Sequence, residues 1–210
     1  ADEPVYLGSS VGFTLSQSHQ VAGPRLRAAA PDDAGGEFVA RLYDEYAQRA
    51  WNPTDLAGLV SYVEFNSKMT EVLLQRVDRI TMRHSLEARA PFLDHQLGEL
   101  AFSLSEADKI PGRRLKGLLK EAASRRLPAE VVDRPKMGFS FPFKEWLRGP
   151  LSAPVGECFA GTRLFSDGWV DAKFARRLLA EHRAGVDHAP RVWALYSLAR
   201  WYDRWVAEGR

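Results

Sequence analysis

The longest hydrophobic pattern in the chain runs over residues 54–80, where apolar side chains recur at intervals of three and four. The residues of this stripe are Leu56, Leu59, Val60, Val63, Leu73, Leu74, Val77 and Ile80. Such spacing places the side chains on one face of an α-helix. The pattern therefore predicts one long helix that begins after an N-cap at Thr54 and packs its apolar stripe into the core.

Similar periodicity predicts shorter helices over residues 37–49, 96–104, 115–126, 143–147, 171–183 and 191–206. The last of these is apolar all round and rich in Trp and Tyr, which indicates a largely buried helix. Residues 9–20 are polar, and residues 21–36 are rich in Ala, Pro, Gly and Asp, so both segments are interpreted as loops. No segment has a convincing strand-length alternation.

Charged residues gather at the end of the long helix, in the stretch VDRITMRHSLEARAPFLD at residues 77–94. The apolar, Pro-containing run at 90–93 is typical of buried, extended or turning chain. A charged side chain in buried chain costs several kcal/mol of stability unless it is paired with an opposite charge, and such a cost is otherwise tolerated only for a function. Glu87 and Arg89 lie at this junction. The residues alone leave two interpretations open: a functional site, or a structural network of Glu, Arg and Asp ion pairs.

Composition narrows the function classes. The chain has 210 residues, of which 45% are hydrophobic, enough for one sizeable core. Its 29 basic and 27 acidic residues nearly balance, so there is no electrostatic case for nucleic acid or an anionic membrane as partner. No apolar run approaches the ~18 residues of a membrane helix. A single cysteine, Cys158, excludes an internal disulfide and a cysteine-based zinc cluster, and favours a reducing cytoplasm.

Two sequence blocks resemble a known family. The pattern VDR-x-TM-x-x-SLEAR-x-PFLD and the later LP…RPK-x-GF block, which starts at Leu127, are similar to motifs of the asparagine synthetase family, whose relatives include β-lactam synthetase. Two long blocks in order are far more specific than one short motif. The resemblance implies an α/β fold of the adenine-nucleotide-hydrolase (PP-loop ATP ligase) type. Residues 1–210 are expected to be the mostly α-helical second half of that domain.

The same resemblance implies ATP-dependent amide formation through an acyl-adenylate, with ATP and Mg²⁺ as cofactors. In matching positions, Glu87 and Lys136 would be catalytic and Asp2 would bind the metal. Three further residues would contact ATP: Lys116, Arg134 and Gly138. The family's SGGxDS phosphate loop does not occur in the 210 residues, and Cys158 is not placed like a glutaminase nucleophile. The upstream ATP-binding half and a glutaminase domain are thus expected partners, and this chain alone is expected to be inactive.

Several questions stay open at this level. Aspartate is the default acid and ammonia from glutamine the default nitrogen donor, but the sequence does not name the acid. One alternative is a ring-closing amide synthetase of the β-lactam or macrolactam type, which uses an internal amine. The other is a non-catalytic interaction module that keeps the fold. Homodimer formation is also open.

Overall fold

The computed structural model describes residues 12–30, 34–135, 137 and 141–209. The chain divides into two compact units. The first comprises Ala1–Ser10 and Glu37–Gly138, and the second comprises Val11–Gly36 and Phe139–Arg210. The described residues form no β-strand, and their only β-pairing is an isolated antiparallel bridge between Ala22 and Val170. The mostly helical character predicted from the sequence is therefore confirmed for this part of the chain, whereas its place as the second half of a domain stays a prediction.

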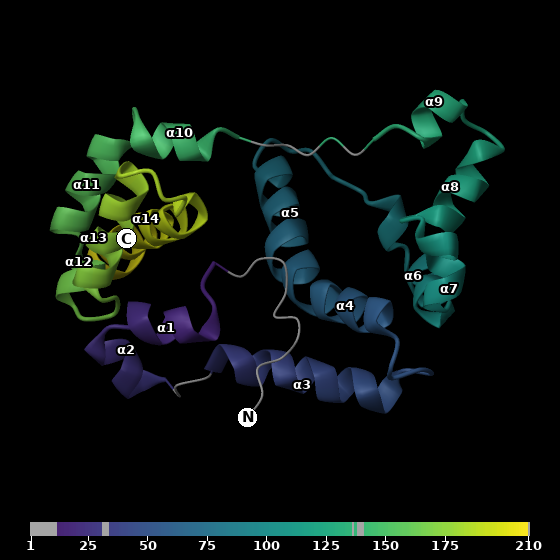
Figure 1. Ribbon diagram of the computed structural model, residues 1–210, viewed down its shortest axis with the longest axis horizontal. Coiled ribbons are helices and arrows are strands. Elements are labelled where there is room, and N and C mark those ends of the chain that lie inside the picture. The colour runs from purple at the N-terminus through teal and green to yellow at the C-terminus, as the bar shows by residue number, and fades with distance from the viewer. Residues whose placement is uncertain (1–11, 31–33, 136, 138–140, 210) are drawn as a thin grey trace. The chain divides into compact units, whose positions relative to one another are not determined.

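The first unit contains a continuous helical run that bends through a π-helical stretch (Figure 1). Its helices are α3 (Ala34–Arg49, which begins at the unit boundary), α4 (Leu56–Glu64), η1 (Phe65–Leu74), α5 (Gln75–Met82), η2 (Pro91–Leu93), α6 (His95–Ser103), α7 (Glu106–Lys109), η3 (Pro111–Arg113), α8 (Gly117–Ser124) and α9 (Ala129–Val132). The run from α4 through η1 to α5 is the long helix predicted over 54–80. Its N-cap is Asp55, however, whose carboxylate accepts the N–H of Gly58 at 3.0 Å. The predicted cap Thr54 instead donates its hydroxyl to Asn52 Oδ1 at 2.7 Å.

The predicted burial of the long helix is wrong over most of its length. Val63 is fully buried, but Leu56, Val77 and Ile80 expose 54%, 44% and 58% of their surface. The buried hydrophobic residues of the first unit are Val39, Leu42, Tyr46 and Val63. These residues all lie on α3 and α4, so the described elements of this unit cover only the first part of the stripe. Periodicity predicted which face is apolar but not what packs against it.

The second unit consists of two short helices followed, later in the chain, by a bundle (Figure 1). Its helices are α1 (Leu15–Val21), α2 (Pro24–Ala29), α10 (Phe143–Arg148), α11 (Ser152–Gly161), α12 (Arg163–Ser166), α13 (Ala172–Arg183), α14 (Ala189–Tyr202) and η4 (Asp203–Ala207). The loops predicted over 9–20 and 21–36 are wrong where the structure describes them. Thr14 and Gln17 form a capping box that starts α1. Pro24 occupies the first turn of α2, a position that tolerates its missing N–H.

The core of the second unit lies between α11, α13 and α14. Its largest fully buried apolar side chains are Phe159, Leu147, Val155 and Val192. The prediction that the last helix is largely buried is only partly right. Its face with Val192, Leu195 and Ala199 is buried, whereas Trp193, Trp201 and Trp205 expose 37%, 53% and 53% of their surface. The described neighbours of α14 therefore cover one face of the helix.

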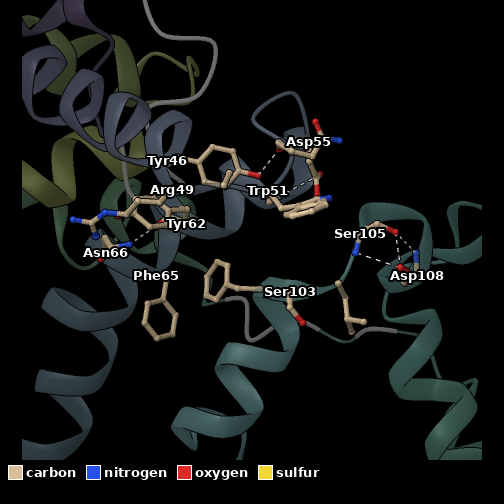
Figure 2. A pocket seen from close by; sticks show the side chains of 15 residues that line it. Tyr46, Arg49, Trp51, Asp55, Tyr62, Phe65, Asn66, Ser103, Ser105 and Asp108 are labelled. Carbon is tan, nitrogen blue, oxygen red and sulfur yellow. Dashed lines mark hydrogen bonds between the residues drawn. The ribbon is translucent and has the colours of Figure 1, made fainter.

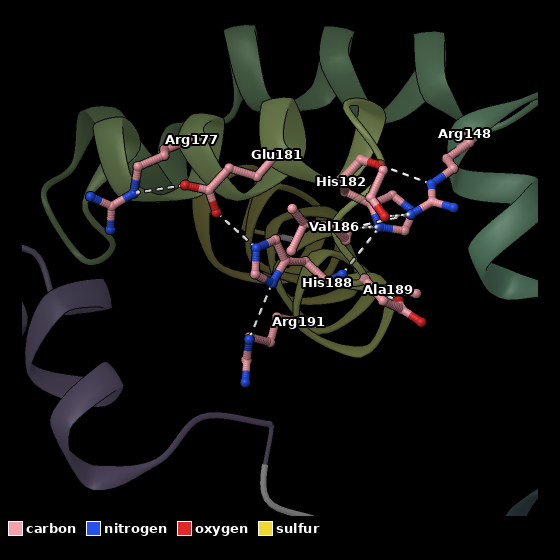
Figure 3. A network of polar contacts seen from close by, with 10 residues as sticks. Arg148, Arg177, Glu181, His182, Val186, His188, Ala189 and Arg191 are labelled. Carbon is pink, nitrogen blue, oxygen red and sulfur yellow. Dashed lines mark hydrogen bonds and ion pairs between the residues drawn. The ribbon is translucent and has the colours of Figure 1, made fainter.

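A polar network ties α10 to the turn between α13 and α14 (Figure 3). Arg148 donates to the carbonyls of His182 at 2.8 Å and Gly185 at 2.7 Å. His182 is fully buried; its Nδ1 accepts the N–H of His188 at 3.2 Å. Nδ1 also lies 3.2 Å from the carbonyl of Val186, and Nε2 lies 3.2 Å from the carbonyl of Lys144. Each of these groups has a structural partner, so we assign the network to the fold.

Candidate functional site

The charged stretch at 77–94 is a helix end, a turn and an extended segment. Helix α5 ends at Met82, with Arg83 as its C-cap. Ser85 then adopts a left-handed backbone conformation, with φ of 58°. This conformation commonly terminates a helix and redirects the chain, although glycine adopts it more readily than serine does. The extended residues that follow carry Glu87 and Arg89 toward η2, and Asp94 caps α6 by accepting the N–H of Gln96 at 3.0 Å.

Glu87 and Arg89 form a two-pronged ion pair. Arg89 donates from Nε to Glu87 Oε1 at 3.1 Å and from Nη2 to Oε2 at 3.2 Å. The Glu87 side chain is 66% exposed and that of Arg89 81% exposed. The prediction that this junction is buried chain is wrong, since Phe92 is also 68% exposed. No described element of this unit covers the segment. Both charges are therefore accessible to solvent, and the ion pair does not serve to neutralise a buried charge.

Lys116 lies at the N-cap position of α8, whereas the helix predicted over 115–126 would include it, and its φ is 58°. It is exposed. Two residues earlier, Arg114 donates from Nη2 to Asp133 Oδ1 at 2.6 Å. This ion pair joins the segment before α8 to the end of α9, directly before Arg134. The structure thus fastens together the two segments that carry Lys116 and Arg134.

The structure brings together only part of the predicted site. Within the described residues, no hydrogen bond or ion pair links Glu87 to Lys116 or Arg134. Arg134 is exposed and places Nη2 3.7 Å from the sulfur of Met137. The predicted residues Asp2, Lys136 and Gly138 lie outside the described residues.

A pocket of about 650 Å³ lies in the first unit, and none of Glu87, Lys116 and Arg134 lines it (Figure 2). The segments that line it are the end of α3, the α3–α4 turn, α4, the start of η1, the end of α6 and the start of α7. Burial raises the pKa of its Tyr46, and the charge of Asp55 raises it further. Burial, followed by the contact with Glu45, raises the pKa of Tyr62. Sequence patterns missed this pocket; the available signal was the helix break Trp51-Asn52-Pro53 between two Tyr-bearing helices.

Two features are not found in the part of the chain that the structure describes. There is no group of three or more His, Cys, Asp or Glu side chains arranged to hold a metal ion. There is also no helix of sufficient length and apolarity to cross a membrane. The predicted Mg²⁺ ligand Asp2 lies outside the described residues.

The chain is similar to part of several longer proteins. A Mycobacterium tuberculosis protein, provisionally named a glutamine-hydrolysing asparagine synthetase, is 33% identical over 97% of this chain and 30% of its own length. The glutamine-hydrolysing asparagine synthetase 1 of Bacillus subtilis is 28% identical over 69% of this chain and 23% of its own length. A Gibberella zeae protein named amidase chry2 is 30% identical over 64% of the chain and 20% of its own length. The chain thus spans less than a third of these relatives. No solved structure matches it.

The family model described as asparagine synthase matches residues 14–203, which cover both compact units. This match includes both sequence blocks that suggested the family. The chain belongs to the asparagine synthase family.

Proposed function

We propose that this chain is the C-terminal part of an ATP-dependent amide-forming ligase of the asparagine synthetase type. The acid it serves is aspartate by default, and the nitrogen is ammonia released from glutamine. The family match over residues 14–203 supports this proposal. So do the relatives named asparagine synthetase, which align with the chain over a limited part of their length.

Exposed apolar side chains of the first unit support the view that further polypeptide completes the catalytic domain. Ile80, Leu86, Phe92 and Leu115 expose between 58% and 74% of their surface. Large exposed apolar patches mark interaction surfaces, because leaving such side chains in water forfeits about 1.5–3 kcal/mol each. We infer that the rest of the synthetase domain, with the loop that binds the phosphates of ATP, covers these side chains.

The proposed reaction has two steps. A carboxylate oxygen of the acid attacks the α-phosphorus of ATP, the bond from that phosphorus to the β-phosphate oxygen breaks, and pyrophosphate leaves. Ammonia then attacks the carbonyl carbon of the acyl-adenylate, and the carbon–oxygen bond to AMP breaks. The nitrogen loses a proton as the amide forms.

Residues of this chain serve both steps. The Glu87 carboxylate lies on exposed extended chain, where it would orient the ammonia and accept its proton. Lys116 and Arg134, which lie close in sequence to the paired residues Arg114 and Asp133, would supply positive charge to the leaving pyrophosphate, together with Lys136. Asp2, which lies outside the described residues, would hold Mg²⁺, and the ion would offset negative charge on the phosphates of ATP.

The observation that carries the proposal is the exposed Glu87–Arg89 pair on the extended segment of the family motif.

The proposed ligase activity is tested in the longer polypeptide that contains this chain, which is assayed for acid-dependent exchange of pyrophosphate into ATP. Lys136→Ala is expected to lower kcat by about a hundred- to thousandfold, the usual loss for one electrostatic contact to a transition state. Lys136→Arg should restore part of the rate, because a planar guanidinium is not a point charge.

The control is Lys173→Ala, which removes an exposed lysine from α13 in the second unit and should leave kcat unchanged. An effect of Lys136→Ala on KM alone would assign Lys136 to substrate binding. Pyrophosphate exchange by residues 1–210 alone would contradict the inferred need for the rest of the domain. Absence of exchange in the longer polypeptide with every acid tried would contradict the ligase assignment itself.

A further inference from the structure

The pocket of about 650 Å³ in the first unit is lined mainly by aromatic rings, with a few polar side chains among them (Figure 2). Its aromatic lining residues are Tyr46, Trp51, Tyr62, Phe65 and Phe102. Tyr46 contacts Tyr62, and Phe65 lies edge-on to Phe102, each pair at 5.7 Å between ring centroids. A concave, mostly apolar site of this size with a small number of polar groups is typical of small-molecule binding.

The turn between α3 and α4 forms an ordered wall of this pocket. Tyr46 is only 8% exposed, and its hydroxyl donates to the carbonyl of Asp55 at 3.2 Å. The N–H of Asp55 donates to the carbonyl of Asn52, also at 3.2 Å. Trp51 directly precedes this closed turn, and Asp55 ends it. A ligand would therefore meet side chains whose backbone is already held in place, which lowers the entropic cost of binding.

Asp55 offers the pocket one carboxylate oxygen. Its Oδ1 caps α4 by accepting the N–H of Gly58 at 3.0 Å, whereas within the described residues its Oδ2 accepts no hydrogen bond. A Cβ at Gly58 would meet both Asp55 Oδ2, at 3.1 Å, and the Tyr46 hydroxyl, so the two oxygen atoms flank the same point. Burial, and after it the charge of Asp55, raises the pKa of Tyr46, as expected for a carboxylate beside the phenol. The Asp55 carboxylate thus adjoins the aromatic wall.

The other charges of the lining are engaged elsewhere. Arg49 donates to the Tyr62 hydroxyl, which itself donates to Glu45 at 3.1 Å. In Figure 2, Arg49 lies to the left of the pocket and Asp55 to the right. Asp108 uses Oδ2 to bind Ser105, and no contact from Asp108 to a ligand at Asp55 is required. The Asp55 end of the pocket therefore favours a ligand group that is positively charged and carries N–H donors.

Trp51 marks the place where a ligand would add most. It lines the pocket four residues before Asp55, yet it is 100% exposed. A tryptophan in a protein core or interface commonly buries about 150–250 Å². An aromatic group beside the indole would remove apolar surface from water, and an ammonium over the ring face would gain a cation–π contact.

We propose that this pocket binds a primary arylalkylamine, a ligand with one ammonium group joined to one aromatic ring by a short alkyl chain. The ammonium donates to Asp55 Oδ2, and the ring lies against Tyr46 and Trp51. Because the only charge is at one end of the ligand and uses one carboxylate, no group has to reach across the pocket. The site uses none of the residues assigned to amide formation, so it stands or falls separately from the proposed ligase activity.

The test measures binding to the longer polypeptide by isothermal titration calorimetry at neutral pH, where an alkylamine is protonated. Phenethylamine carries the ammonium and the ring, 2-phenylethanol replaces the ammonium by a neutral hydroxyl, and n-butylamine keeps the ammonium without the ring. We expect phenethylamine to bind at least about tenfold more tightly than either of the others, because one lacks the charge-assisted hydrogen bond and the other lacks the apolar burial. Equal affinity of phenethylamine and either other probe, or no binding of phenethylamine, would overturn the proposal.

A charge-removing variant tests the assigned contact. Asp55→Asn keeps a good N-cap for α4 and removes the negative charge. It should lower the affinity of phenethylamine to that of 2-phenylethanol and leave 2-phenylethanol unchanged, which also shows that the pocket is intact. Asp44→Asn is the matched control, because Asp44 is an exposed carboxylate of α3 that does not line the pocket. If Asp55→Asn leaves phenethylamine unchanged, or weakens both probes alike, the contact with Asp55 is refuted.

Fluorescence locates the site independently. Phenethylamine should change the tryptophan emission of the protein, and Trp51→Phe should abolish most of that change. Trp205→Phe is the matched control, because Trp205 is also exposed, at 53%, but belongs to the second unit. A signal that survives Trp51→Phe and disappears in Trp205→Phe would place binding elsewhere and overturn the proposal.

Discussion

Replacing Glu87 by glutamine separates the two interpretations of the motif, an ion pair kept for stability and a carboxylate kept for chemistry. The change keeps the shape of the side chain and removes its charge. Glu87 accepts two hydrogen bonds from Arg89, at 3.1 and 3.2 Å, and the side chains of Glu87 and Arg89 are 66% and 81% exposed. Exposed pairs contribute about 0–1 kcal/mol, because water and salt screen them and two long side chains must be ordered. A buried pair would instead cost about 3–5 kcal/mol when broken.

We therefore expect Glu87→Gln to lower the free energy of unfolding by no more than about 1 kcal/mol. Urea denaturation of the purified chain measures this value, with Glu99→Gln as the control. Glu99 is an exposed carboxylate on α6 of the same unit and has no ion pair among the described side chains. In the longer polypeptide, single-turnover amide formation by Glu87→Gln should fall by about two orders of magnitude or more, because proton transfer by a positioned group contributes that much.

Three results for Glu87→Gln would contradict these expectations. A loss of about 3 kcal/mol or more, absent in Glu99→Gln, would show that Glu87 is buried in solution and that the exposed geometry is wrong. An unchanged rate of amide formation in the folded protein would end the assignment of Glu87 to chemistry. Loss of activity in proportion to unfolding would favour the purely structural interpretation.

Three further results are expected from the second unit. Phe159→Ala, at a site 1% exposed in the core, should lower the free energy of unfolding by about 3–5 kcal/mol in chemical denaturation, and a loss below about 1 kcal/mol would contradict the described packing. Asp171→Ala should cost about 1 kcal/mol in the same assay because Asp171 accepts the N–H of Phe174 at 2.7 Å, whereas Asp171→Asn, still a good cap, should cost much less. Burial, followed by the charge of Asp203, raises the pKa of the Cys158 thiol, so its alkylation by iodoacetamide should require higher pH than that of a free thiol. Equal rates at all pH values would refute the shift.

Local patterns predicted many helices correctly. Helices α10 and α13 lie where the periodicity placed them, and Phe174, Leu178 and Leu179 of α13 are buried as its apolar face predicted. The capping box of α1 was also present in the sequence, at Thr14 and Gln17, but the polar composition of that segment favoured a loop. Such signals depend on residues three or four apart, which are neighbours in the chain.

Burial could not be predicted in the same way. Val77 and Ile80 at the end of the stripe and the Trp residues of the last helix are exposed, because the described elements of each unit cover only part of those helices. An apolar stripe specifies that a face can be buried, but a partner from elsewhere in the polypeptide decides whether it is. The same limit applies to Phe92, whose apolar surroundings in the sequence suggested buried chain.

The sequence by itself determined the family, since two blocks of residues in the right order need no coordinates to be recognised, and it named the candidate charges Glu87, Lys116 and Arg134. Only the tertiary structure decided how they are held. It pairs Glu87 with Arg89 in the open, and it joins Arg114 to Asp133 across 19 residues of chain. It also built an aromatic pocket from six segments that show no common pattern. Contacts between residues far apart in the chain depend on how whole helices pack, and linear spacing carries no record of that.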